Sequence, residues 1–408
     1  MLSHLRIRAV LPVVATGTLF IALGGAGQTP SGTQVPEAKG PSKPPTASLY
    51  EAETVQFSAP PPAVTATGTL CDERGNMYLQ YLASVQLLMS QLRDGGISNL
   101  PLTRVSLESN KTTEFRVPAP EGYPHYYDRG FYVTPRGNVY VLIEAYRYGQ
   151  DYKEDPNWPD SFVVKYKDDG SVDSVTKLGL PQDVHFSPSK LGVFGDGTLL
   201  VTGTEVSGPR HTPSKVFTAV FDRAGTYVGP VTLTDDVHPA PPQPGAIGAE
   251  GTASPAETGN ERAAQGAGGG PDLAWAMDVR QGRMLGSPDG NIYLFRDTSP
   301  ARVCVVSPGG VVTRQFRITP PERGMKPIKV SFGGQGEMLV EFSTLATPDS
   351  RQSHTVVGLV DPESGDVVQV VAPPPNAGVL GCLSPKNEFL FLRTSKDEHL
   401  EVAGFVSR

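Results

Sequence analysis

A short turn followed by an apolar strand recurs along the chain and predicts a repeated β-structure. Its clearest copy is the segment 137–143, Gly-Asn-Val-Tyr-Val-Leu-Ile, and further copies surround Gly75, Gly197, Gly290, Gly336 and Asn387. Glycine adopts a positive φ freely and asparagine tolerates it, as a tight hairpin turn requires. The third residue after the turn glycine, or after Asn387, is Tyr in three copies and Leu in three. This position therefore calls for bulk rather than a hydroxyl group, and we interpret the turn as structural.

Each of these turns joins two strands, here called A and B, and a second hairpin turn then joins strands C and D. The second turns fall at Asn110, Gly170, Gly225, Gly310 and Gly365. Apolar and polar residues alternate around them, for example over 162–166 and 174–178, as in half-buried strands. The second turns are 50 to 60 residues apart once the insertion 238–272 is subtracted. Four strands in that length are typical of a propeller blade. We predict an all-β, six-bladed β-propeller with four-stranded antiparallel blades.

The last repeat ends after its C strand, residues 400–406, without a D strand. The segment 54–58 precedes the first repeat and has a strand-like pattern, so it can complete the last blade and close the ring without a long open edge. We place the propeller at residues 49–408. Residues 27–48 are rich in Pro, Gly, Ser and Thr and are expected to form a disordered tether, and 238–272 a disordered insertion.

Residues 1–26 have the pattern of a secretory signal peptide. His4, Arg6 and Arg8 form a basic start, 9–23 an apolar stretch, and Gly-Gly-Ala at 24–26 a small-residue cleavage site. The apolar stretch is shorter than the roughly 20 residues of a membrane span. An uncleaved anchor is the alternative. We predict a secreted or periplasmic protein, or one tethered to the cell surface, with no transmembrane segment after the signal peptide.

Charge and cysteine content narrow the possible partners. Without residues 1–26, which carry two Arg and no acid, the formal net charge is −9. This disfavours nucleic acid as a partner, because phosphate binding needs a basic surface. Cys71 and Cys382 would lie on neighbouring inner strands if the first and last repeats meet. They could form a disulfide, but two small buried core residues are the favoured interpretation. We expect a monomer.

Two turn motifs carry a resemblance to a known fold family. The Asp/Pro-x-Gly-Asn-hydrophobic-Tyr-Val pattern and Phe221-Asp222-Arg223-Ala224-Gly225 resemble six-bladed propellers of the NHL-repeat or senescence-marker (gluconolactonase) type. The resemblance implies architecture more than activity, since such folds include lactonases, lyases, quinoprotein dehydrogenases and binding modules. Lactonases of this type hold a divalent cation with carboxylate and amide oxygens. Their early Glu-Gly-Pro-x-Trp motif is matched here only by 121–126, with an inserted Tyr, and a later Asn-Gly-Leu segment is missing. We therefore assign no catalytic residue, metal or cofactor.

The long connections B–C and D–A of a propeller emerge at one end, where we expect any site. Basic residues recur there, near the ends of the A and B strands, and the loop 146–160 mixes aromatic and polar residues. The candidate ligand-binding residues are Arg296, Arg393, Arg283, Lys190, Lys329, Tyr81, Tyr148 and Trp158. Arginines at such a channel mouth could clamp a carboxylate or uronic acid. Alternatively, the basic residues pair with Asp297, Glu341 or Glu144, and the loop aromatics only cap a blade.

We predict a binding module for a carbohydrate, an anionic small molecule, a peptide or a protein at the loop-rich face. A lactonase- or lyase-type enzyme with a site at the channel mouth is the alternative.

Overall fold

A computed structural model describes residues 44–57, 64–65, 70–82, 99–148, 158–207, 212–233, 283–296, 301–333, 335–344 and 354–407 of the chain. These residues fall within one compact unit, Lys43–Arg408. They form strands and turns, without a helix among them. The all-β prediction is confirmed. The insertion 238–272 and most of the loop 146–160 lie outside the described residues.

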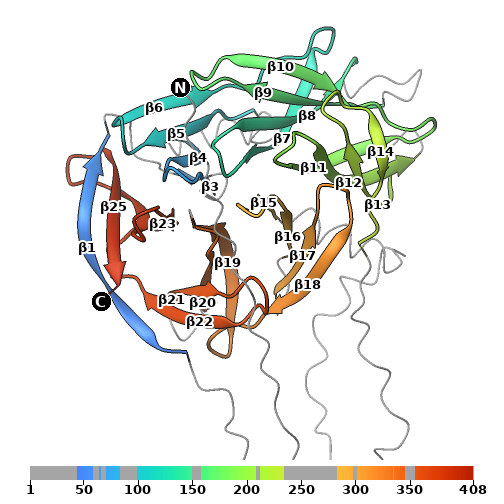
Figure 1. Cartoon of the computed structure of the whole chain (residues 1–408). Coiled ribbons are helices and arrows are strands. Elements are labelled where there is room, and N and C mark those ends of the chain that lie inside the picture. Colours follow the sequence, from blue (N-terminus) through green and yellow to red (C-terminus); the bar gives the residue numbers. More distant parts are fainter. Residues whose placement is uncertain are drawn as a thin grey trace, which may run out of the picture. The chain divides into compact units, whose positions relative to one another are not determined.

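The strands assemble into five hydrogen-bonded sheets, here called I to V in chain order (Figure 1). Sheet I contains β2 (Val64–Thr65), β3 (Leu70–Cys71), β4 (Met77–Leu82), β5 (Leu102–Ser106) and β6 (Lys111–Phe115). Sheet II contains β7 (His125–Val133), β8 (Val139–Tyr146), β9 (Asp160–Tyr166) and β10 (Val172–Lys177). Sheet III contains β11 (Phe186–Val193), β12 (Leu199–Ser207), β13 (Thr212–Phe221) and β14 (Tyr227–Pro230). Sheet IV contains β15 (Arg283–Gly286), β16 (Ile292–Arg296), β17 (Ala301–Val306) and β18 (Val312–Ile318).

Sheet V has eight strands in the order β19-β20-β21-β22-β1-β25-β24-β23. Their bounds are β19 (Met325–Phe332), β20 (Met338–Thr344), β21 (Thr355–Val360), β22 (Val367–Ala372), β1 (Thr46–Gln56), β25 (Leu400–Ser407), β24 (Phe389–Thr394) and β23 (Val379–Leu383). Within each sheet, successive strands pair antiparallel, and the contact of β1 with β22 is parallel. Sets of four antiparallel strands with their first strands innermost make a propeller-like arrangement (Figure 1).

The predicted turns are confirmed one by one. In all six copies the A–B turn joins two strands that are consecutive in the chain, and its central residue has a positive φ, from 61° at Asn387 to 93° at Gly336. The five predicted C–D turns also have a residue with positive φ, such as Gly225 at 81°. These turns repeat because each brings the chain back along the same sheet with a residue that tolerates the left-handed region.

The interpretation of the tyrosine position was incomplete, because the hydroxyl groups are used. Tyr78 donates a hydrogen bond to the Asp72 carboxylate (2.9 Å), and Tyr293 donates to Asp289 (3.1 Å). Asp72 is buried and also accepts from the backbone N–H and the side-chain amide of Asn76. The phenol therefore satisfies a buried carboxylate in the turn of sheet I, beyond filling space.

The N-terminal strand pairs with the last strand, as predicted, but over a longer segment. In β1, Val55 lies opposite Val402 and Tyr50 opposite Val406. The N–H of Phe57 extends the contact to the carbonyl of Leu400. The first residues of β1 also pair with β22, where Thr46 lies opposite Val370. β1 thus joins both halves of sheet V.

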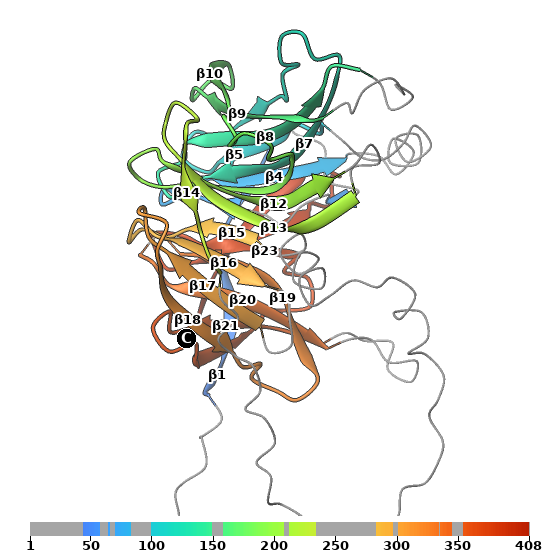
Figure 2. The ribbon, with the colours of Figure 1, turned by 90° about the vertical axis from the view of Figure 1, so that its right-hand side faces the viewer.

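The core consists of apolar layers between neighbouring sets of strands. One cluster packs sheets II, III and IV together, a second packs IV against β19–β22, and a third packs I against II. A fourth lies within sheet V, and a fifth joins β24 and β25 to sheet I through residues such as Met77 and Leu390. Figures 1 and 2 agree in placing sheet III between sheets II and IV.

Cys71 of β3 and Cys382 of β23 form a disulfide with 6.1 Å between their Cα atoms. The favoured interpretation of two unpaired core residues was therefore wrong, because the first and last repeats do meet and bring β3 beside β23. The bond spans 311 residues of sequence and fastens the two ends of the repeat array. Cys304 is buried in β17 and is not part of this disulfide.

Candidate functional site

Three of the predicted basic residues come together on neighbouring first strands. Lys190, Arg283 and Lys329 belong to β11, β15 and β19, and each lies seven residues before its A–B turn glycine. Burial lowers the pKa of Lys190, and the positive charge of Arg283 lowers it further. The same arginine also lowers the pKa of Lys329. We call these three residues together with Glu341 the inner-strand cluster.

Lys329 is the most enclosed member, with 5% of its surface exposed. Burial lowers its pKa to about 7, although the nearby Glu341 carboxylate acts in the opposite direction. Glu341 lies directly across from Lys329 in the β19–β20 register. Burial raises the pKa of Glu341, against the influence of Lys329 and Arg283. The Lys329 ammonium also donates a hydrogen bond to the carbonyl of Leu380 in β23, so this side chain bridges two strand sets.

The arginines at the ends of the B strands do not share one environment. Arg296 is buried at the end of β16, opposite Arg302 of β17. Arg393 donates to Glu51 of β1 (2.8 and 2.9 Å) and forms an ion pair with Glu401 of β25 (3.1 Å). For Arg393, the alternative of an ion pair between strands is therefore the one observed. Its acidic partners are Glu51 and Glu401, not the residues named in the sequence-based alternative.

The three aromatic candidates belong to other strands and loops than the cluster does. Tyr81 is half-buried in β4, and burial raises the pKa of its phenol. Trp158 stacks flat on His185, with 3.7 Å between ring centroids, so it joins the start of β9 to the start of β11. Tyr148 is 48% exposed. Because residues 149–157 lie outside the described part, the rest of that loop stays a prediction.

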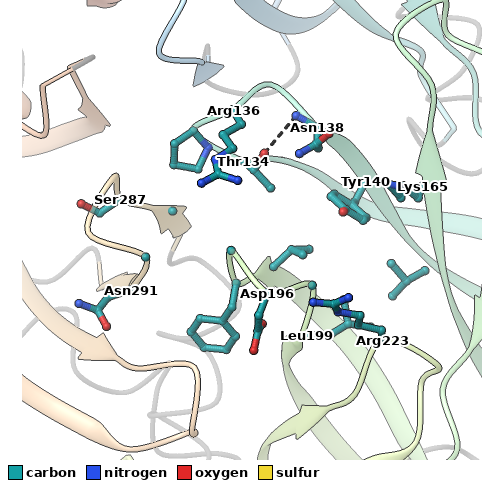
Figure 3. A pocket seen from close by; sticks show the side chains of 18 of the residues that line it. Thr134, Arg136, Asn138, Tyr140, Lys165, Asp196, Leu199, Arg223, Ser287 and Asn291 are labelled. Atoms are coloured by element: carbon teal, nitrogen blue, oxygen red, sulfur yellow. Dashed lines mark hydrogen bonds between the residues drawn. The ribbon is translucent and has the colours of Figure 1, made fainter. Parts of the chain in front are cut away.

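A cavity of about 430 Å³ lies at the opposite end of the strands from the predicted site (Figure 3). It is lined by A–B turns from four sheets, including Glu73 of sheet I, Arg136 of sheet II, Asp196 of sheet III and Asn291 of sheet IV. We call it the turn-end cavity. Sequence analysis missed it because each turn contributes only one or two polar side chains, and no single segment carries a motif.

The turn-end cavity has a mixed polar and apolar lining that contains charges of both signs. Arg136, Arg223 and Lys165 supply positive groups, and Glu73 and Asp196 supply carboxylates. Lys165 forms an ion pair with Asp173 (2.8 Å), which raises the pKa of the lysine. The guanidinium groups of Arg136 and Arg223 make no hydrogen bond or ion pair within the described part of the chain.

No group of three or more His, Cys, Asp or Glu side chains among the described residues could hold a metal ion. No helix in the described ranges is long and apolar enough to cross a membrane.

The chain was compared with known proteins at the level of sequence and of structure. No protein-family model matches it, and no curated protein matches it in sequence. Among solved structures, a protein of unknown function from Dyadobacter fermentans aligns with TM-score 0.47 and 12% identity, covering 88% of this chain and 99% of that one. An α-L-arabinanase from Penicillium chrysogenum, complexed with arabinobiose, aligns with TM-score 0.39 and 11% identity over 88% and 98% of the two chains.

A gluconolactonase-like protein aligns with TM-score 0.37 and 10% identity, covering 89% of this chain and 93% of that one. At these values the likenesses carry no functional argument. The assignment of a propeller-like fold rests on the strand pairing itself.

Proposed function

We propose that this protein is a β-propeller binding module for a small anionic ligand held by the inner-strand cluster. The observation that carries the proposal is the convergence of Lys190, Arg283 and Lys329, with Arg283 acting electrostatically on both lysines. Arg283 and Lys329 also act on the carboxylate of Glu341, and burial disfavours the charged forms of both lysines. A carboxylate-bearing ligand would favour the charged amines and accept hydrogen bonds from them.

The lowered lysine pKa values give the proposal a specific signature. At neutral pH the amine of Lys329, with a pKa of about 7, is partly unprotonated. A bound anion favours the charged form of nearby amines and raises their pKa. Binding should therefore take up protons from the buffer near pH 7.5.

The test is calorimetric titration of the full chain with gluconate in two buffers of different ionisation enthalpy. We expect saturable binding, a buffer-dependent enthalpy that reports proton uptake, and about tenfold or greater loss of affinity in Lys190→Met. Lys167→Met removes an exposed lysine outside the cluster and serves as the control. Binding that is equal in both variants, or absent in the wild type, would contradict the proposal.

One observation supports the enzyme alternative, and it is the lowered pKa of Lys329. An amine with a pKa near 7 is suited to accept a proton at neutral pH. A lactonase- or lyase-type activity would therefore depend on Lys329. Gluconolactone hydrolysis above the buffer rate that is lost in Lys329→Met, while the variant keeps its folded circular dichroism spectrum, would favour the enzyme over the plain binding module.

We also propose that the protein is secreted or periplasmic. The Cys71–Cys382 disulfide supports this, because disulfides persist mainly in oxidising compartments. The basic and apolar pattern of residues 1–26 supports it independently. N-terminal sequencing of the protein recovered from culture medium or periplasm should begin near Gly27. A chain that still carries Met1 would contradict cleavage.

We further propose that the fold is a six-bladed propeller of the NHL or gluconolactonase-like type. Six A–B turns with equivalent backbone conformation support this count. Sheet V then represents two blades joined at the parallel contact of β1 with β22. An experimental structure that resolves the segments between the described ranges tests the count directly.

A further inference from the structure

The turn-end cavity is independent of the inner-strand cluster and carries its own binding chemistry. We propose that it binds an acidic sugar of one or two rings, with the sugar carboxylate on Arg136 or Arg223 and the hydroxyl groups on the surrounding carboxylates and amides. The cavity volume of about 430 Å³ lies at the small end of the range for small-molecule sites, about 300–1,000 Å³. It suits a short ligand rather than a long polymer segment.

Two guanidinium groups provide the anion recognition. Arg136 belongs to the A–B turn of sheet II and Arg223 to the C–D turn of sheet III, and Figure 3 shows them on different sides of the same space. Arg223 lies against Gly197, where an added Cβ would come within 3.0 Å of its Nε atom. The glycine thus makes room for the arginine side chain. A planar guanidinium binds a carboxylate through two parallel hydrogen bonds, which a lysine cannot reproduce.

The carboxylates of the cavity explain why a hydroxyl-rich ligand fits better than a simple anion. One oxygen of Asp196 accepts the backbone N–H of Thr198 (2.9 Å), and Glu73 is half-buried across the cavity. Both carboxylates can accept hydrogen bonds from sugar hydroxyls. An inorganic anion offers these carboxylates no hydrogen-bond donor, whereas a neutral sugar leaves the guanidinium groups without a carboxylate.

Tyr140 and Lys165 complete the wall between sheets II and III. Burial raises the pKa of the Tyr140 phenol, so this group stays protonated and can donate a hydrogen bond at neutral pH. Lys165 is already neutralised by Asp173 and leaves the balance of charges to the two arginines and two carboxylates. This balanced lining matches a ligand with one carboxylate per ring and several hydroxyls.

The experiment is calorimetric titration of the full chain with digalacturonate, with lactose and inorganic sulfate as comparators. Arg136→Gln and Arg223→Gln should each weaken digalacturonate binding by about tenfold to a hundredfold, since each removes a charged hydrogen-bond donor. Asp196→Asn should weaken it less. Lactose and sulfate should bind at least about a hundredfold more weakly than digalacturonate. Arg317→Gln changes an exposed arginine of β18 outside the cavity and should bind like the wild type.

Lys190→Met separates this site from the inner-strand cluster, because it should leave digalacturonate binding unchanged. Loss of binding in Lys190→Met but not in Arg223→Gln would place the sugar at the cluster and overturn the inference. Absence of digalacturonate binding, equal affinity for lactose, or equal affinity in the two cavity arginine variants and the wild type would also overturn it. Unchanged melting temperatures of the variants would show that the affinities report on binding rather than folding.

Discussion

Residues at equivalent positions of the repeat have different structural roles in the different sheets. Seven residues before the turn glycine, the chain has Gly130 in sheet II but cationic residues in β11, β15 and β19. Likewise, the tyrosine three residues after the glycine binds a turn carboxylate at Tyr78 and lines a cavity at Tyr140. The repeat sets the backbone at these positions, and the neighbouring sheets determine what the side chains do.

The buried Lys329 makes folding stability depend on pH. Its pKa is lowered from 10.5 to about 7 by burial, so between these pH values the unfolded chain binds more protons than the folded one. Through this group, the free energy of unfolding therefore rises with pH above about 7, by at most about 1.4 kcal/mol for each pH unit. The raised pKa of Glu341 gives a slope of opposite sign, beginning at the ordinary glutamate value near 4.5.

Lys329→Met should flatten this dependence. Urea unfolding at pH 7 and pH 9 should show a gain in the free energy of unfolding for the wild type and a smaller gain for the variant. Lys167→Met, at an exposed position, should keep the wild-type difference. Parallel pH dependence in Lys329→Met and the wild type would show that the lysine is not buried as the structure places it.

Among the elements, β1 is held largely by backbone pairing and by polar side-chain contacts. Along its eleven residues only Leu49 is buried, and most of the others are exposed. Its side chains are anchored by Arg393, which contacts Glu51 of β1 and Glu401 of β25. The hydrogen bond from Arg393 is the main cause that lowers the pKa of Glu51 to about 2, so this contact persists until the pH falls well below 4.5.

Arg393→Met should loosen β1 without unfolding the rest. Amide hydrogen exchange in residues 46–56 should accelerate by about two- to tenfold, as expected for losing a mostly exposed ion-pair network. Exchange in β12, a buried strand of sheet III, should stay at the wild-type rate. Arg317→Met is the matched control. Equal acceleration in β1 and β12 would indicate global destabilisation instead of local release.

The elements that sequence patterns predicted are those whose signal is local. Each A–B turn is encoded by one glycine or asparagine and the apolar strand behind it, so all six were found. The full length of β1 was missed because its residues are polar and its partners are β22 and β25, more than 300 residues away. The turn-end cavity was missed for the same reason, since its walls come from four separate turns. The inner-strand cluster was predicted because aligning the repeats placed its basic residues in one register.

At the scale of the whole molecule, one strand pairing and one disulfide close the repeat array. β1 joins the first residues of the described chain to the last strand, and the Cys71–Cys382 disulfide joins β3 to β23. The apolar cluster between sheet I and strands β24 and β25 packs beside them. The first and last repeats are thus held together by backbone pairing, apolar packing and a covalent link.

Reduction of the disulfide should weaken the closed structure. Urea unfolding with and without a phosphine reductant should differ by about 2–5 kcal/mol in the free energy of unfolding, as for other native disulfides. The double variant Cys71→Ala/Cys382→Ala should unfold like the reduced wild type and should not respond to the reductant. If the bond is present, Cys304 alone should react with a thiol reagent in the unfolded, unreduced protein. Three reactive thiols under these conditions would contradict the bond.

The pairing of β1 with β25 also imposes an order on biosynthesis. Residues 46–56 leave the ribosome early, yet most of their strand partners are residues 401–407, which are made some 350 residues later. The emerging chain must therefore keep a largely polar strand unpaired while the sheets between form. Contacts this distant in sequence are slow to form. β1 should thus be among the last elements to join the native fold. Its mostly exposed side chains are compatible with a segment that stays solvated until its partner strand has been made.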